Sequence, residues 1–161
     1  MILRRVARPL LASIFIYGGI GALRDVQGHA KAVEPFLEET FDKVEGVLPA
    51  GVPRDPVTLV KIDAGVKIGA GLALATGKAP RLASFLLLGT LLPTTLATHR
   101  FWDVKEPAVR QQQTAEFVKN ASLAGGLLLA TADTGGKPSF GWRARRGAKK
   151  AAKRAEAVLP N

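Results

Sequence analysis

Apolar residues in this 161-residue chain are gathered into four blocks, and charged residues lie between the blocks and at the two ends. The blocks run at about 6–23, 57–75, 82–97 and 117–132. Each has about 16 to 19 residues, at the short edge of the ~20 that a helix needs to cross a bilayer. The pattern predicts an all-α, four-helix transmembrane bundle, and a soluble four-helix bundle is the alternative.

The charges between the blocks alternate in sign. Basic residues dominate before the first block, between the second and third, and in the tail at 133–161, which carries eight bases against two acids. The segment 24–55 has seven acids against four bases, and 99–116 is balanced. Because basic loops stay in the cytoplasm, we expect a membrane domain over 1–132 with both termini cytoplasmic, followed by a basic cytoplasmic tail at 133–161.

The first block also fits a signal peptide, because bases precede an apolar run and Ala30 and Ala32 offer a small-x-small cleavage site. However, Arg24 and Asp25 separate that site from the apolar core. The sequence therefore favours a retained first helix.

The second block carries charges that are costly in lipid. Asp63 and Lys67 lie four residues apart, so they can pair on one helical face. Lys61 lies close enough to the outer end to reach the interface. The opposite face has a stripe of small residues that would let another helix approach closely: Gly65, Gly69 and Ala73. We expect this helix in the interior of the bundle.

The third block contains Pro93, which removes a backbone hydrogen bond, followed by Thr94 and Thr95, whose hydroxyls can satisfy freed carbonyls. Just beyond its end lie His99 and Trp102. This pair has two interpretations: a site for a ligand or quinone headgroup, or aromatic and polar anchors at the outer interface.

Between the first two blocks, apolar residues recur with helical spacing. Pro35 suits a first turn and Gly46 a helix end. The pattern predicts a short amphipathic helix on the outer surface, whose apolar face is formed by Leu37, Phe41, Val44 and Leu48.

The fourth block, FVKNASLAGGLLLA, opens with Lys119 and Asn120. Either both residues are interfacial anchors, or they turn inward to a polar, outward-opening pocket between spans. In the second case Lys119 would approach Asp63, and Asn120 would need a partner such as His99. Gly125 and Gly126 keep the helix narrow enough for close packing.

The basic tail is alanine-rich and can form a helix. It is either a solvated tail or a surface for anionic lipids, and few aromatics accompany its bases, so nucleic-acid binding is not favoured. The candidate lipid contacts are Arg143, Arg145, Arg146, Lys149, Lys150, Lys153 and Arg154.

The composition excludes several chemistries. There is no cysteine, so disulfides, thiol catalysis and cysteine-based metal sites are excluded, and two histidines are too few for a histidine-rich metal site. No phosphate-binding glycine loop, nucleophile elbow or zinc motif occurs. We expect no catalytic residue, no metal and no covalent cofactor.

The stretch THRFWDVKEPAVRQQQTAEFVKNASLAGGLLLA resembles the DoxX family of small bacterial membrane proteins. The family pattern is an external H-x-F-W, a glutamine-containing link, and F-x-KN followed by GG-x-L. The matching residues are His99, Phe101, Trp102, Gln112, Phe117, Lys119, Asn120, Gly125, Gly126 and Leu128.

The resemblance implies a four-helix protein of the bacterial plasma membrane. Some members of the family are subunits of thiosulfate:quinone oxidoreductase, and others are linked to membrane oxidoreductase complexes. The hypothesis that follows is a subunit of a redox-associated complex, with quinone as a candidate ligand; the alternative is a non-catalytic scaffold or accessory subunit. The expected partners are the bilayer and either proteins of the complex or further copies of the chain.

Overall fold

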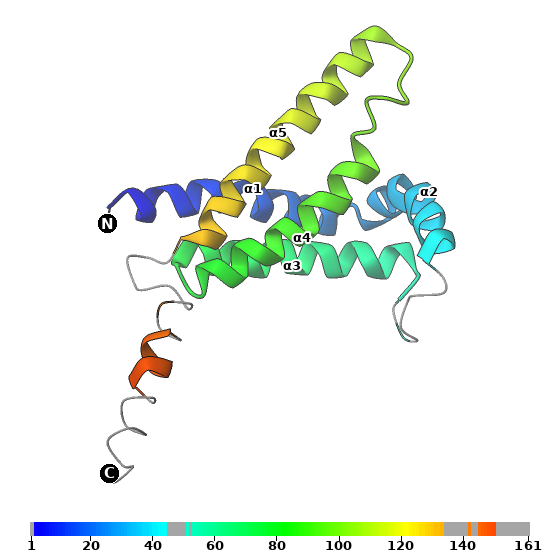
Figure 1. Ribbon diagram of the computed structural model, residues 1–161. Coiled ribbons are helices and arrows are strands. Elements are labelled where there is room, and N and C mark those ends of the chain that lie inside the picture. Colours follow the sequence, from blue (N-terminus) through cyan, green and yellow to red (C-terminus); the bar gives the residue numbers. More distant parts are fainter. Residues whose placement is uncertain (1, 45–50, 52, 134–141, 143–144, 151–161) are drawn as a thin grey trace, which may run out of the picture. The chain divides into compact units, whose positions relative to one another are not determined.

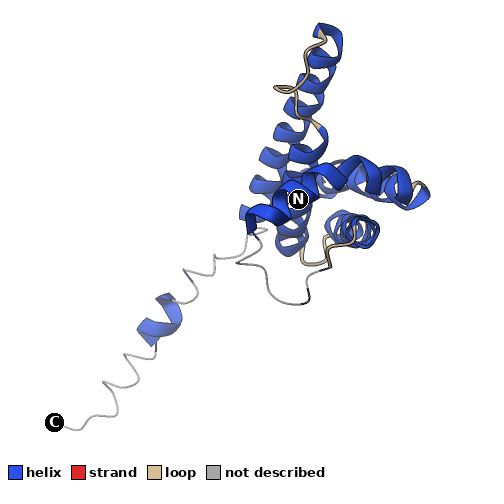
Figure 2. Cartoon of the chain, turned by 90° about the vertical axis from the view of Figure 1, so that its right-hand side faces the viewer, coloured by secondary structure: helices blue, strands red, loops and turns tan. Residues whose placement is uncertain are grey.

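The computed structural model describes residues 2–44, 51, 53–133, 142 and 145–150. The described part contains helices joined by loops and turns and no strand (Figures 1 and 2). The prediction of an all-α chain is therefore confirmed. The main helices are α1 (Ile2–Arg24), α2 (Val26–Val44), α3 (Pro56–Thr76), α4 (Pro80–Thr98) and α5 (Pro107–Ala132).

The chain divides into two units, one at 1–131 and one at 132–161. In the first unit α1, α3, α4 and α5 contain the four apolar blocks and run in alternating directions. The start of α1, the turn between α3 and α4 and the end of α5 lie toward one end of this unit, and α2 lies toward the other (Figure 1). In the second unit, residues 145–150 are helical.

Local signals set the ends of α3 and α4. Asp55 caps α3: its carboxylate accepts hydrogen bonds from the Thr58 backbone N–H (2.8 Å) and hydroxyl (2.6 Å). These hydrogen bonds hold the pKa of Asp55 below its usual range. Gly77 ends α3 in the left-handed conformation, at φ 74°. Pro80 then occupies the first turn of α4, where its missing N–H costs nothing.

The core of the first unit is formed by residues of α1, α3, α4 and the second half of α5, and it includes Phe15, Leu74, Leu87 and Leu127, all buried. Glycine permits the close approach of α1 to α3. A Cβ atom placed on Gly19 would lie 2.9 Å from the Ala64 carbonyl oxygen. The two backbones therefore touch at a distance that only glycine allows.

The small-residue stripe on α3 does not pack as predicted. A Cβ atom on Gly65 or Gly69 would meet no atom within 4 Å. Among the described residues their face is therefore open, and of the three stripe residues Ala73 is the one that lies against the described core. The reason is that α1 approaches α3 on a different face, the one that carries Ala64 and Gly71. In the described part of the chain, α3 is therefore covered by α1 on the face with Ala64 and Gly71, and the close packing expected at Gly65 and Gly69 stays a prediction.

The amphipathic segment is helical, but it starts earlier than expected. The Asp25 carboxylate accepts a hydrogen bond from the Gly28 backbone N–H (3.0 Å), which caps the start of α2. Pro35 therefore lies inside the helix rather than in its first turn. Leu37 and Phe41 are half-buried, as the predicted apolar face requires. The predicted end at Gly46, and Leu48, lie outside the described residues.

Two helices, α1 and α4, are long and apolar enough to cross a membrane by length and composition. A core helix of a soluble protein would pass the same test, but it would be mostly covered. Here large apolar side chains on these helices are open to the surroundings: Leu10 is 69 % exposed, Tyr17 77 % and Phe85 61 %. Exposed apolar surface of this kind indicates contact with a membrane or with another protein.

Candidate functional site

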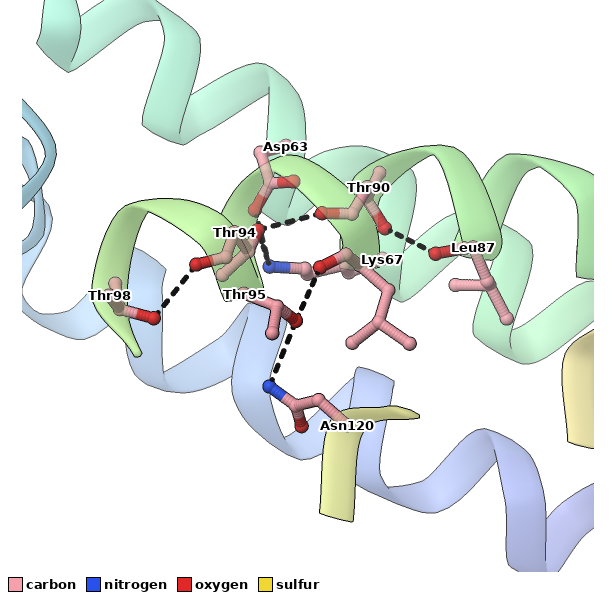
Figure 3. Close-up of polar contacts among 9 residues, drawn as sticks. Asp63, Lys67, Leu87, Thr90, Thr94, Thr95, Thr98 and Asn120 are labelled. Atoms are coloured by element: carbon pink, nitrogen blue, oxygen red, sulfur yellow. Dashed lines mark hydrogen bonds and ion pairs between the residues drawn. The ribbon is translucent and has the colours of Figure 1, made fainter. Parts of the chain in front are cut away.

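The centre of the candidate site is an ion pair on α3. Asp63 Oδ2 lies 2.6 Å from Lys67 Nζ, as their four-residue spacing predicts. The ammonium also donates a hydrogen bond to the Thr94 hydroxyl of α4 (3.1 Å; Figure 3). The Lys67 side chain is only 13 % exposed and that of Asp63 30 %. Charges so withdrawn from water are costly unless they are paired; here the pair lies within α3, and Lys67 also links it to α4.

The α4 backbone orients the two threonines that follow Pro93. The Thr94 hydroxyl donates to the Thr90 carbonyl (2.7 Å), and the Thr95 hydroxyl donates to the Leu91 carbonyl (2.7 Å). Each hydroxyl hydrogen is thereby used, and the oxygen is left to accept from a donor outside the helix. Thr94 accepts from Lys67 of α3, and Thr95 accepts from the Asn120 amide of α5 (3.1 Å; Figure 3).

The threonine hydroxyls do not satisfy the carbonyl that proline frees, which is the role predicted for them. In a helix, Pro93 leaves the carbonyl of the residue four positions earlier, Gly89, without its usual donor. The threonine hydroxyls bond to other carbonyls, those of Leu87, Thr90, Leu91 and Thr94. Thr94 and Thr95 therefore serve as acceptors between helices, and none of these hydroxyls replaces the bond lost at proline.

Lys119 and Asn120 point to different partners. Asn120 is half-buried and bonds to Thr95, so it faces α4, but its partner is not His99. Lys119 is exposed and pairs with Glu116, one turn away on the same helix, and not with Asp63, whose partner is Lys67. The ammonium of Lys119, which donates to Glu116, lowers the pKa of that carboxyl. The structure therefore separates the two residues that the sequence placed in one pocket.

At the end of α4, His99 is held beside a group of aromatic rings. Its Nδ1 lies 2.8 Å from Gln113 Oε1 of α5. Phe101 contacts both Trp102 and Phe117 edge to face, with centroids 5.1 and 5.3 Å apart. An amide oxygen only accepts hydrogen bonds, so Nδ1 carries the hydrogen and, in the neutral ring, Nε2 is an acceptor.

A further contact ties α2 to the end of α4. Arg100 lies 2.9 Å from Glu39 and over the ring of Phe36, 5.4 Å from its centroid. Hydrogen bonds from Lys43 and then Arg100 lower the pKa of Glu39 from 4.5 to about 2. The carboxylate form is thus favoured in the folded state, and this contribution is complete above about pH 4.5 and is lost as the pH falls toward 2. Glu39 and Lys43 are exposed and Arg100 is half-buried, so the contribution is small.

The remaining candidates are two glycines of α5 and the basic residues of the tail. Gly126 contacts Leu11 of α1, whereas Gly125 faces open space. In the tail, Arg146 lies over the Trp142 ring, 4.8 Å from its centroid. Arg145, Lys149 and Lys150 are exposed, and the other predicted lipid contacts, Arg143, Lys153 and Arg154, lie outside the described residues. Among the side chains that the structure describes, no group could hold a metal ion.

A comparison with protein families shows which family the chain belongs to. Residues 3–100 match the model of the DoxX family. The chain belongs to the DoxX family. No curated protein matches it, and no solved structure matches it. Membership of this family, together with two apolar helices of sufficient length, indicates a membrane protein.

The family match and the sequence motif cover different parts of the chain. The match ends at Arg100, so it includes α1 to α4 and His99, whereas most of the motif that suggested the family lies on α5. Sequence reasoning also missed Gln113 as the partner of His99. A seven-residue spacing could have found it, because Gln113, Asn120 and the buried Leu127 recur on one face of α5.

Proposed function

We propose that this DoxX protein is a subunit of a redox-associated complex in the bacterial plasma membrane, and that it contacts a quinol headgroup at His99. The observation that carries the proposal is the placement of His99, held by Gln113 beside Phe101, Trp102 and Phe117. With no cysteine in the chain, thiol chemistry in such a complex would belong to a partner protein.

His99 and the aromatic rings beside it match the chemical groups of a quinol headgroup. The headgroup is a flat ring with hydroxyl donors, and Nε2 of neutral His99 is an acceptor. Trp102 is 49 % exposed, so it has ring surface left for an aromatic ligand. His99 and Trp102 would hold the headgroup, and His99 Nε2 could take a proton. The bound group would supply a two-electron carrier within the bilayer.

The arrangement of the helices supports four membrane spans, α1, α3, α4 and α5. The basic residues before the first block and in the α3–α4 turn lie toward one end of the unit, and the acidic segment with α2 lies toward the other (Figure 1). We therefore propose that both termini are cytoplasmic and that α2, His99 and the start of α5 are on the outer side.

Single cysteines test this topology, because the natural chain has none. Glu38→Cys on α2 and Lys150→Cys in the tail replace exposed residues. A membrane-impermeant maleimide added to intact cells should label the first and not the second. Permeabilised cells should show labelling of both, which serves as the control. Labelling of both positions in intact cells, or of Lys150→Cys alone, would show that the topology is wrong.

Purification from native membranes in mild detergent tests the function. The wild-type protein should carry a lipid-soluble quinol, detected by extraction and chromatography as the quinol or as the quinone that forms from it on oxidation in air, and should bring an oxidoreductase with it. His99→Ala should lose most of the quinone but keep the protein partner. His29→Ala is the matched control, because His29 is exposed on α2 and bonds only locally, to the Asp25 carbonyl. Equal quinone content in the two variants would contradict the proposal that the headgroup binds at His99.

The alternative is a scaffold or accessory subunit without a ligand. The open face of α3 favours it, since Gly65 and Gly69 would let a helix of another protein approach closely. In this case the purified protein would bring a partner but no quinone, and His99→Ala would change nothing.

A further inference from the structure

Basic residues from separate parts of the chain gather at one end of the first unit, where α1 begins, α3 passes into α4, and α5 ends (Figure 1). The segments 1–24 and 77–98 that supply these bases contain no acidic residue, and the first acid after α5 is Asp133. We call this surface the basic end, and it comprises Arg5 and Arg8 of α1, Lys78 of the α3–α4 turn and Arg81 of α4.

Two arginines of the basic end are held against backbone atoms. Nε of Arg81 donates to the Thr131 carbonyl near the end of α5 (2.7 Å). A Cβ atom on Gly77 would lie 3.3 Å from Nη1 of Arg8, so the guanidinium of α1 lies against the end of α3. Lys78 follows Gly77 directly, and Arg81 begins the next helix one turn later. The α3–α4 turn is therefore the centre of the basic end.

The groups around this turn suit a phosphate. A guanidinium that is held through Nε keeps its Nη groups for donation to phosphate oxygens. The start of α4 adds positive potential, because its cap residue, Ala79, has no side chain that can accept from the first N–H groups of the helix. Lys78 and Arg81 are exposed, so a ligand can reach both.

The helix face that begins at Arg81 continues as an apolar surface. Phe85 follows Arg81 by four residues and so lies on the same face of α4. The spacing continues through Leu92 and Leu96, and all three apolar side chains are exposed. A ligand with an anionic head and an apolar chain would thus find both of its parts matched along one helix.

We propose that the basic end binds the phosphate of an anionic phospholipid at Lys78 and Arg81, with an acyl chain along the apolar face of α4. Inorganic phosphate would use the cations but not Phe85, Leu92 and Leu96. The proposal requires contact with a membrane, which the family match indicates. It does not require a quinol at His99, which lies at the opposite end of α4.

The test uses the full chain, purified in a neutral detergent, and follows its melting temperature with increasing short-chain phosphatidylglycerol, phosphatidylcholine or inorganic phosphate. Phosphatidylglycerol should stabilise the wild type at a lower concentration than phosphatidylcholine, and phosphate should have little effect. In Lys78→Gln/Arg81→Gln the phosphatidylglycerol concentration needed should rise about fivefold for each cation removed, the change that ~1 kcal/mol per base near a lipid surface gives. Arg81→Lys keeps the charge but loses paired donation, so its rise should be smaller.

Two matched controls remove the same charge elsewhere from exposed positions: Lys31→Gln/Lys61→Gln in α2 and α3, and Lys149→Gln/Lys150→Gln in the tail. Both should respond to phosphatidylglycerol as the wild type does. Because Arg81 also holds the end of α5, Lys78→Gln alone, with an expected rise of about fivefold, replaces the double variant if that variant does not fold. An equal response to both lipids, an equal loss in either control, or stabilisation by phosphate at the same concentration would overturn the proposal. Quinol bound at His99 is measured separately, so the two proposals fail independently.

Discussion

Asp63→Leu is expected to destabilise the protein strongly, whereas Asp63→Leu/Lys67→Leu should restore most of the stability. The single change leaves the Lys67 ammonium, 13 % exposed, with only the Thr94 hydroxyl as a partner. Removing one member of a buried pair costs about 3–5 kcal/mol, and the lower figure applies here because Asp63 is partly exposed. The double change removes both charges and replaces them with apolar volume.

Thermal unfolding in detergent measures the stability of both variants, and recovery of the partner oxidoreductase from native membranes measures function. If the double variant is stable but no longer recovers its partner, the ion pair serves the function of the protein. If it is stable and fully functional, the pair is only structural. A single variant as stable as the wild type would show that water reaches Lys67 and that the helices do not enclose the pair.

Gly19→Leu should be the most damaging change in the helical packing. The first side-chain atom alone would lie 2.9 Å from the Ala64 carbonyl oxygen and 2.8 Å from the Ile68 side chain. Ile68 can rotate away, but the carbonyl moves only if α3 moves. We expect a loss of about 3 kcal/mol or more, at the upper end for inserting atoms into a packed core. The yield and melting temperature of folded protein in detergent check this.

Two glycines provide controls for that experiment. A Cβ atom on Gly18, the neighbour in α1, or on Gly69 in α3 would meet nothing within 4 Å. Leucine at either position should leave the melting temperature of the purified chain close to that of the wild type. A Gly69→Leu variant as unstable as Gly19→Leu would mean that the open face of α3 is covered in the purified protein by another copy of the chain.

At the glycines of α3 and at the start of α5, the sequence alone does not specify which residues contact each other. A small-xxx-small pattern identifies a helix face that permits close approach, but α3 has two such faces, and the pattern at Gly65 and Gly69 gave the one that α1 does not use. Adjacency in the sequence suggests that Lys119 and Asn120 share one pocket. Adjacent helical residues point about 100° apart, so one faces α4 and the other pairs with Glu116 on its own helix.

Spacing along the chain was enough to predict three features: a helix over each of the four apolar blocks, the Asp63–Lys67 pair and the family. Short-range geometry controls these features, because hydrophobic period and four-residue spacing act within one helix. The tertiary structure alone decided which helix faces meet. It brought Thr94 to Lys67, Thr95 to Asn120 and Gln113 to His99. Those contacts depend on how separate helices cross. The crossing is set by side-chain packing over the whole unit, and no short stretch of sequence specifies it.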